Sequence, residues 1–220
     1  MLSNPLESDG RFRVLKNALA SYGHRSSSPL IPDMTTLRAA VALVLRARDP
    51  LELLLVKRAT SESDPWSGHM ALPGGRHDKS DSDLLSTAKR ETMEEVGVDL
   101  DQSAPLLGRL EETSPSTQRL PTLSISPFVF GVTGDRDAHV ASSEIGQIFW
   151  VRIEDLMSPK NHCTVEIVLP GGPREFPCFS IEDEHVWGLT YRILSQFFDL
   201  LTSDMLDGLK LYILNPPTRR

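Results

Sequence analysis

The chain has 220 residues and a formal net charge of −7, with 40% hydrophobic and 24% charged residues. These values suit one large globular domain, or one domain with a short extension, with enough apolar residues for a sizeable core. General nucleic-acid binders are more often basic, so the charge argues against a DNA or RNA partner. An anionic small substrate stays open, because local arginines or a bound cation can reverse the field within one cleft.

Targeting signals and membrane spans are not evident in the sequence. Residues 1–23 lack the basic start and apolar core of a secretory signal, and no apolar run approaches the ~18 residues of a membrane helix. Two cysteines, Cys163 and Cys178, stand outside any CxxC spacing. We interpret them as reduced core thiols and expect a cytoplasmic protein with no membrane partner.

The first half of the chain predicts one helix and two strands. Apolar residues recur at helical spacing over residues 11–22, and a Ser- and Pro-rich linker follows at 26–34. Runs rich in Val, Leu and Ala predict buried strands at 37–47 and 51–59, separated by an Arg-Asp-Pro turn. A polar loop then leads to a Gly-Gly turn.

The second half predicts a helix that ends at a glycine, several strands, a hairpin around Pro-Gly-Gly-Pro and a closing amphipathic helix. The expected ranges are a helix at 82–97, strands at 105–113, 123–133 and 147–153, a helical turn at 152–157, a hairpin at 164–181 and a helix at 184–202. Many strands with separated helices indicate an α+β fold with α/β/α layers.

Three carboxylates crowd the end of the 82–97 helix. Glu91, Glu94 and Glu95 fall within one arc about 100° wide, because successive helical residues are rotated by about 100°. Like charges one turn apart repel by a few tenths of a kcal/mol, so something should compensate. Arg90, on the flank of Glu94, can hold that side chain by a charge-assisted hydrogen bond.

A solvated acidic face is the plain interpretation of this cluster, and a metal site is the alternative. Mg²⁺ prefers an octahedral shell of carboxylate, carbonyl, water and phosphate oxygens. The Gly74–Gly75 turn precedes the helix closely, and a glycine carbonyl can approach an ion without a side chain in the way. This combination favours a cation between the carboxylates.

At this point the residues resemble the Nudix hydrolase box, G-x5-E-x7-R-E-U-x-E-E-x-G-U, where U is aliphatic. The second half matches from Arg90 onward, with Thr92 at the first aliphatic position. The first half differs, because Gly75 to Arg90 is one residue longer than the pattern and the upstream Glu is absent. Asp81 or Asp83 lies near its place.

The resemblance implies a Nudix fold, in which a mixed β-sheet lies between helices. We expect an N-terminal helix and linker at 1–35, a Nudix domain at 36–203 and a C-terminal tail at 204–220. It also implies an Mg²⁺ or Mn²⁺ site, whose expected ligands are Gly75, Glu91, Glu94 and Glu95.

The expected catalytic residues are Glu94, Glu95, Arg90 and Glu144. Many Nudix enzymes bring one extra carboxylate from a loop after the box, as metal ligand or general base, and Glu144 is the candidate here. The alternative is a plain loop residue that starts the next strand. Two basic residues, Arg58 and Arg76, are expected to bind substrate.

Three further stretches are similar to the coenzyme A diphosphatase branch: 67–91, 145–156 and 184–201. The upstream signature of that branch is kept in part, and its second arginine is missing. The resemblance therefore implies a pyrophosphohydrolase for a nucleoside diphosphate linked to another moiety, with coenzyme A first.

Other substrates and another class of function stay open. ADP-ribose, dinucleotides and nucleotide sugars are the alternative substrates, and a homodimer is left open. A non-catalytic Nudix-fold regulator that binds a nucleotide is the alternative class. We interpret Trp187 as a core residue rather than a platform for a base, and we expect no role for His69 and His77, which flank the glycine turn.

Overall fold

A computed structural model describes most of the chain, namely residues 9–23, 36–62, 64, 66–115, 123–132, 137–169 and 171–201. The predicted linker and the predicted tail at 204–220 lie outside these ranges.

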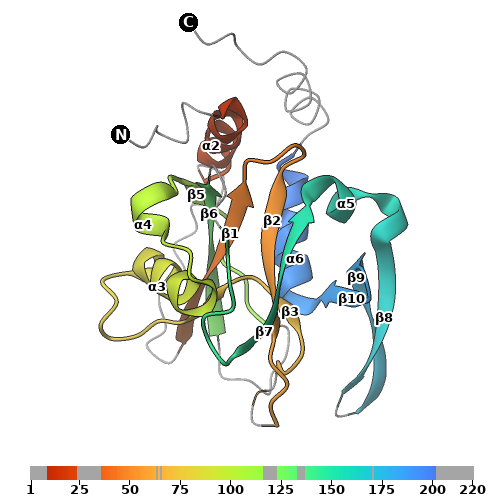
Figure 1. Cartoon of the computed structure of the whole chain (residues 1–220). Coiled ribbons are helices and arrows are strands. Elements are labelled where there is room, and N and C mark those ends of the chain that lie inside the picture. The colour runs from red at the N-terminus through yellow and green to blue at the C-terminus, as the bar shows by residue number, and fades with distance from the viewer. Residues whose placement is uncertain are drawn as a thin grey trace, which may run out of the picture.

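A mixed sheet forms the centre of the molecule (Figure 1). Its strands are β1 (Leu37–Arg46), β2 (Glu52–Arg58), β3 (Met70–Ala71), β4 (Gly74–Arg76), β5 (Leu106–Arg109), β6 (Leu123–Val132) and β7 (Ile145–Arg152). The order is β3-β2-β1-β6-β5, with β4 also paired to β1 and β7 to β2. Strands β1 and β6 are parallel, whereas the other neighbouring pairs are antiparallel.

Helices cover both faces of this sheet. The helices are α2 (Gly10–Gly23), α3 (Leu84–Val96), α4 (Leu100–Ser103), α5 (Ile153–Met157) and α6 (Gly188–Asp199). In β1, Leu43 and Leu45 pack in one core with residues of α2, α5 and α6, while Ala42 and Val44 pack in a second core with α3. Side chains alternate along a strand, so one buried strand serves both cores. The predicted α+β fold with helices on both sides of a mixed sheet is confirmed.

The N-terminal helix α2 shares the first core. Its apolar stripe, Phe12, Leu15 and Leu19, is buried. The strands make room for it, because a Cβ at Gly131 would lie 2.8 Å from the Phe12 ring and one at Gly108 would lie 2.6 Å from Leu19. The predicted helix is thus confirmed and packs as part of the sheet's own core.

A second, smaller sheet follows β7, α5 and a 3₁₀ turn at Pro159–Asn161. Its strands β8 (His162–Leu169), β9 (Gly172–Ile181) and β10 (Glu184–Trp187) are antiparallel in the order β10-β9-β8. The predicted hairpin is confirmed. The predicted start of the last helix is wrong, because residues 184–187 form β10 and α6 begins at Gly188, whose φ of 65° ends the strand.

The two cysteines lie opposite each other on β8 and β9. Cys163 pairs with Cys178 in the strand register, their Cα atoms are 5.1 Å apart, and a disulfide joins them. The interpretation of two reduced thiols is therefore wrong. Strand register brought the sulfur atoms together, and a separation of 15 residues in the sequence does not reveal that register.

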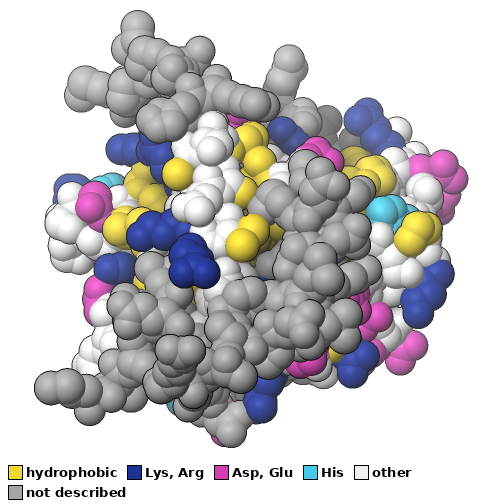
Figure 2. All heavy atoms as spheres, turned by 90° about the horizontal axis from the view of Figure 1, so that it is seen from above, with side chains coloured by type: hydrophobic (Ala, Val, Ile, Leu, Met, Phe, Trp, Pro, Cys, Tyr) yellow, Lys and Arg dark blue, Asp and Glu magenta, His cyan; other side chains and the backbone are white. Residues whose placement is uncertain are grey.

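No helix among the described residues is long and apolar enough to cross a bilayer. Figure 2, which looks down from above Figure 1, shows acidic, basic and hydrophobic side chains interspersed over the described part of that face. Such mixing is ordinary for a surface in contact with water.

Candidate functional site

The glycine turn forms a short strand against the centre of the sheet. In β4, Gly74 pairs with Val41 and Gly75 with Ala40 of β1. A Cβ at Gly74, whose φ is 152°, would lie 2.3 Å from the Ala40 carbonyl oxygen. At Gly75 a Cβ would lie 2.4 Å from the Glu91 carboxylate. Both glycines are needed for close approach, the first to the sheet and the second to α3.

Helix α3 is well defined at both ends. Asp83 caps its N-terminus by accepting a hydrogen bond from the Ser86 N–H at 2.7 Å, and Gly97 ends it with a left-handed φ of 70°. Thr92 occupies a fully buried position, where its hydroxyl donates to the Ala88 carbonyl at 2.7 Å. These features fix the rotation of the helix and therefore the direction of its carboxylates.

The three carboxylates of α3 differ in exposure. The side chain of Glu95 is 6% exposed, that of Glu91 is 18% exposed and that of Glu94 is 57% exposed. Along the predicted acidic arc, the exposure of the carboxylates therefore increases from Glu95 in the core to Glu94 in the solvent. Burial raises the pKa of Glu91, and the charges of Glu94 and Glu144 raise it further against the effect of Arg90.

Glu95 lies deepest and faces the glycine turn. Its Oε2 accepts a hydrogen bond from the Gly74 N–H at 2.9 Å, and its Oε1 is 3.9 Å from Nη1 of Arg58. Burial raises its pKa to about 7, with contributions from the charges of Glu91 and Glu144, while the Gly74 N–H and Arg58 act in the opposite direction. A buried carboxylate held this way binds either a proton or a cation near neutral pH.

Arg90 connects the helix to the loop before it. Its guanidinium donates to Asp81 through Nε at 2.9 Å and Nη2 at 3.1 Å, and to Glu94 through Nη1 at 3.0 Å. Its Nη2 also lies 2.9 Å from Glu91. The Arg90 pair holds the pKa of Asp81 well below its usual range. The predicted contact with Glu94 is confirmed, and of the two aspartates near the place of the missing upstream Glu, Asp81 is the one that bonds Arg90.

Arg58, at the end of β2, contacts three carboxylates. Its Nε donates to Asp64 at 2.6 Å, and its Nη2 lies 3.4 Å from Glu144, while Nη1 faces Glu95. Asp64 is in turn fixed by the Trp66 N–H at 3.0 Å. Burial acts to lower the pKa of Arg58, but its carboxylate partners raise it. Burial acts to raise the pKa of Asp64, but the Trp66 N–H and Arg58 lower it. Arg58 thus links the polar loop after β2 to the acidic site.

Glu144 reaches the site from a loop that docks on the end of α3. The His139 N–H donates to the Val96 carbonyl and the Ala141 N–H donates to the Glu95 carbonyl, each at 3.0 Å. The Glu144 carbonyl accepts from the Ala59 N–H at 2.8 Å, next to Arg58. The Glu144 side chain is 68% exposed. A carboxylate distant in sequence from the glycine turn therefore shares Arg58 with Glu95, and its charge raises the pKa values of Glu91 and Glu95.

The other residues singled out in the sequence near the turn are one arginine, two histidines and Trp187. Arg76 is exposed at the end of β4, and its carbonyl accepts from Arg90 Nη2 at 3.3 Å. The His77 ring bonds Thr87 at 2.9 Å. The His69 ring lies 4.7 Å from Trp187, and burial lowers its pKa. Trp187 is half-buried at the end of β10, which fits its interpretation as a packing residue.

The donor set fits a hard divalent cation. Three helical carboxylates and Glu144 supply anionic oxygens, and the Gly75 backbone lies against the Glu91 carboxylate with no room for a Cβ. Mg²⁺ and Mn²⁺ take such oxygen ligands together with water and phosphate oxygens. The arrangement can therefore hold a cation beside a polyphosphate and offer a carboxylate to a nearby water.

Sequence reasoning overlooked Asp64 and left Asp81 undecided. Asp64 stands six residues after Arg58, a separation with no regular meaning in a loop, so no spacing signal identifies it. Asp81 and Asp83 are equally acidic in the sequence, but only the first lies within reach of Arg90, because the second caps α3. The signal that favours Asp83 as a cap is its position just before the helical pattern.

The chain is similar to known proteins over much of its length. A family model for the NUDIX domain matches residues 35–167, more than half of the chain. An uncharacterised Schizosaccharomyces pombe protein is 36% identical over 118 residues, which cover 52% of this chain and 36% of the yeast protein. The chain thus spans about a third of that relative's length.

Two further proteins are similar over more of their length. The uncharacterised Nudix hydrolase NudL of Yersinia pestis is 28% identical over 160 residues, 73% of this chain and 77% of its own. A solved MutT/nudix family protein from Enterococcus faecalis is 18% identical with a TM-score of 0.52, covering 83% of this chain and 67% of its own. At that identity the solved structure supports the fold alone.

Proposed function

This chain belongs to the Nudix hydrolase family, and on that premise we propose that its acidic site is a metal-dependent pyrophosphohydrolase site. The substrate would be a nucleoside diphosphate linked to another moiety. The observation that carries the proposal is the convergence of Glu91, Glu95 and Glu144 at the Gly74–Gly75 turn. Such a set of carboxylates is costly without a cation to neutralise it.

The proposed ligands of the cation are Glu91, Glu94, Glu95 and the Gly75 carbonyl. A bound Mg²⁺ or Mn²⁺ would neutralise charge on the phosphate oxygens and lower the pKa of an attacking water. The residues present fit such a cation, because the Gly74 N–H orients Glu95 and no Cβ separates Glu91 from the glycine backbone.

Glu144 is proposed as the general base. Its side chain is mostly exposed and makes one long contact with Arg58, at 3.4 Å, so it is accessible to a water at the site. A base must come within about 3 Å of the water whose proton it accepts. Glu94 and Glu95 would then be occupied by the cation, and Glu144 would accept the proton.

Arg90 is proposed as a positioning residue. Its fork on Asp81 fixes the guanidinium, which in turn holds Glu91 and Glu94. A guanidinium fixed on one side by a bidentate pair holds its other partners in defined positions. The substrate need not touch Arg90 for this role to matter.

Arg58 and Arg76 are proposed to contact the substrate's phosphate or ribose oxygens. Arg76 is exposed at the end of β4, where a bound anion would be accessible. For Arg58 the contacts with Asp64, Glu95 and Glu144 favour a second role, in which it orients the proposed base. An arginine can serve both roles, because its planar group has five N–H donors.

Coenzyme A or a derivative is the proposed substrate class. The proposal rests on the stretches 67–91, 145–156 and 184–201, which are similar to the coenzyme A diphosphatase branch. The second arginine of that branch's upstream signature is missing here. ADP-ribose, dinucleotides and nucleotide sugars are therefore the alternative substrates.

A substrate panel with product masses tests the proposal. Coenzyme A, acetyl-coenzyme A, ADP-ribose, NADH, a diadenosine polyphosphate and UDP-glucose would be incubated with and without Mg²⁺ or Mn²⁺. We expect cation-dependent cleavage of a diphosphate, fastest for coenzyme A, with masses that identify the bond broken. Binding of a nucleotide with no turnover under any of these conditions would instead support a regulator of the same fold.

Three wider expectations also stay proposals. We propose that the domain covers residues 36–203, that the protein is cytoplasmic, and that it acts on a small nucleotide without a nucleic-acid partner. A homodimer is left open, and sedimentation in an analytical ultracentrifuge measures the oligomeric state directly.

A further inference from the structure

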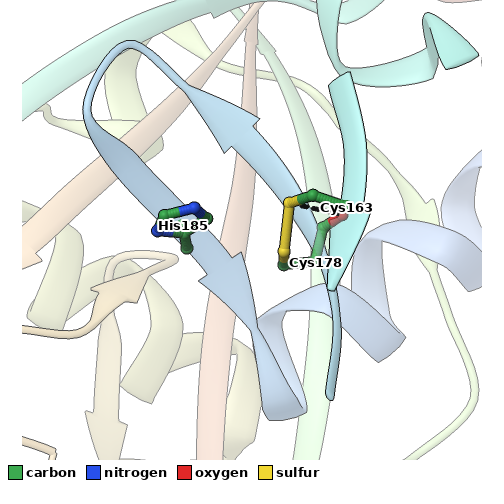
Figure 3. A group of neighbouring side chains, drawn as sticks. All are labelled: Cys163, Cys178 and His185. Carbon is green, nitrogen blue, oxygen red and sulfur yellow. Dashed lines mark hydrogen bonds between the residues drawn. A yellow bond between two sulfur atoms is a disulfide. The ribbon is translucent and has the colours of Figure 1, made fainter. Parts of the chain in front are cut away.

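Three soft donor atoms gather on the small sheet, outside the acidic site. In the register, Cys178 of β9 stands opposite both Cys163 of β8 and Trp187 of β10. His185 lies two residues before Trp187, so it is on the same face of the sheet as Cys178 and diagonal to it. Figure 3 shows His185 on the strand beside the Cys163–Cys178 pair.

The spacing of these atoms suits a tetrahedral metal site. The two sulfur atoms and an imidazole nitrogen of His185 all lie within 4.8 Å of one another. Tetrahedral Zn²⁺ has Zn–S distances of about 2.3 Å and Zn–N distances of about 2.0–2.1 Å, which put its ligand atoms roughly 3.5–3.8 Å apart. Reduction would free the sulfur atoms to separate, and a movement of the His185 side chain would bring the three atoms to that spacing.

The burial of the three residues gives the site a closed side and an open side. Cys178 is buried, Cys163 is half-buried and His185 is exposed. The open side supplies an entry path, and it leaves the fourth position of the metal to water, as in sites with three protein ligands. Strands fix two of the donors directly opposite each other, which reduces the entropy lost on binding.

We propose that reduced Cys163 and Cys178, together with His185, bind one soft divalent cation of the Zn²⁺ type, and that the disulfide excludes it. A dithiol reductant would supply two electrons and two protons, breaking the S–S bond to give two thiols and becoming a disulfide itself. Binding of the cation then releases the two thiol protons, because thiolates are the ligands. Oxidation of the pair by another disulfide would expel the cation.

The chemistry of this site separates it from the acidic site. Sulfur and imidazole select Zn²⁺ and similar soft cations, whereas the carboxylates and carbonyl near α3 suit Mg²⁺ and Mn²⁺. The chain has two cysteines in total. Any thiolate-to-metal absorption band must therefore come from Cys163 and Cys178.

Cobalt(II) provides the test, because a thiolate ligand gives it a charge-transfer band that carboxylates cannot produce. The whole chain, reduced by a dithiol that is then removed under nitrogen, would be titrated with Co²⁺ in excess Mg²⁺. We expect a saturable band with one Co²⁺ per chain, loss of the band on adding Zn²⁺, and no band in protein oxidised to the disulfide. Circular dichroism would check that the reduced chain stays folded.

Two matched histidine variants identify the third ligand. His185→Gln should weaken Co²⁺ binding at least about tenfold, since even outer-shell partners of a metal contribute 10–100-fold. His162→Gln is the control, because His162 neighbours Cys163 but packs on Phe179, on the opposite face of the sheet. Cys163→Ser should lose most of the band.

Each contrary result overturns the proposal. A disulfide that resists the dithiol in the folded protein, unfolding on reduction, or a folded reduced chain without the band would each exclude the site. Binding in His185→Gln equal to that in the unchanged chain would remove His185 from it.

Discussion

The acidic cluster on α3 and the Cys163–Cys178–His185 cluster on the small sheet are assembled in opposite ways. The acidic cluster combines one helix with a glycine turn 16 to 21 residues earlier in the chain, and two arginines hold its carboxylates. The sulfur cluster comes from three strands whose positions are set by register alone. One site is held by charge and the other by backbone geometry.

This difference predicts which substitutions should impair each site. A carboxylate cluster depends on compensation of charge, so removal of a carboxylate or an arginine should change chemistry more than folding. A cluster on paired strands depends on the ladder, so changes to its side chains should leave the strands in place. Variants of the acidic site can therefore be compared with matched variants on β8 and α5.

The largest effect is expected from the helical carboxylates. Glu94→Gln and Glu95→Gln each keep the shape of the side chain but remove a charge and a proposed ligand. We expect kcat to fall roughly 10²–10⁴-fold, or about 3–5 kcal/mol of barrier at ~1.4 kcal/mol per tenfold. Steady-state turnover at saturating Mg²⁺ measures it.

Glu166→Gln, an exposed carboxylate on β8, is the control for the helical variants and should turn over normally. Near-normal rates in both helical variants would contradict the proposed metal site on α3.

The next effect concerns the pH dependence of stability in the metal-free protein. The ordinary pKa of Glu95 is 4.5 and its folded value is about 7, so the folded chain binds more protons than the unfolded chain between these values. Stability should therefore fall as pH rises through this window, by up to about 3 kcal/mol at ~1.4 kcal/mol per pKa unit. The raised pKa of Glu91 acts in the same direction, and the lowered pKa of His69 acts in the opposite direction.

Urea unfolding in a chelator across this pH window measures the slope, and Glu95→Gln should flatten it. The lowered pKa of Asp81 does not interfere, because its contribution is present above the ordinary Asp value of 3.8 and is lost only in stronger acid. An equal slope in the two proteins would show that Glu95 ionises in the folded state as it does in the unfolded chain.

Glu144→Gln separates the proposed base from the proposed ligands. We expect kcat to fall roughly 10–10³-fold, within the ~10²–10⁴ scale of general-base catalysis or just below it, with little change in KM or in Mg²⁺ dependence. The comparison variant is Glu154→Gln on α5, which is exposed and distant from the glycine turn in the sequence. If Glu144→Gln turned over coenzyme A and ADP-ribose at the wild-type rate, Glu144 would be a loop residue with no role as the general base.

A smaller effect should come from the glycine turn. Gly75→Ala adds a Cβ 2.4 Å from the Glu91 carboxylate, which must move, whereas Gly146→Ala adds one with its nearest neighbour at 3.6 Å. We expect kcat to fall about 10–10²-fold in the first, because a displacement near 1 Å can cost 10²-fold. Parallel kinetics and thermal unfolding of the two variants check this. Equal kcat values would mean that Glu91 need not lie against Gly75.

The smallest effect is expected for Arg90→Lys. Lysine keeps the charge but cannot form the two-pronged contact with Asp81, so the carboxylates would be held less firmly. We expect kcat to fall about tenfold, at the low end for an outer-shell partner of a metal, with KM nearly unchanged. A large rise in KM with kcat preserved would instead indicate direct contact of Arg90 with the substrate.

Several features could be predicted because they are local. The helical period alone places Arg90, Glu91, Glu94 and Glu95 together, and the position of Gly97 ends the helix. The layered α+β fold follows from the alternation of strand-like and helix-like runs. Neither inference requires knowledge of which strands are neighbours.

The second sheet shows where local patterns fail. Residues 184–187 carry an apolar stripe that continues into α6, and the sequence pattern extends the helix over them. In the structure Val186 pairs with Phe179 and is fully buried, so contact with β9 outweighs the helical pattern. The left-handed glycine at 188 then separates strand from helix.

The sequence by itself determined the family, the mixed sheet between helices and the acidic face of α3, because each depends on spacing within a short segment. Only the tertiary structure decided which aspartate binds Arg90, that Arg58 meets Glu95 and Glu144, and that the two cysteines are bonded. These contacts join segments far apart in the chain or within irregular loops, where no periodicity relates one residue to another. Their geometry is set by strand register and by the docking of loops on the sheet and helix.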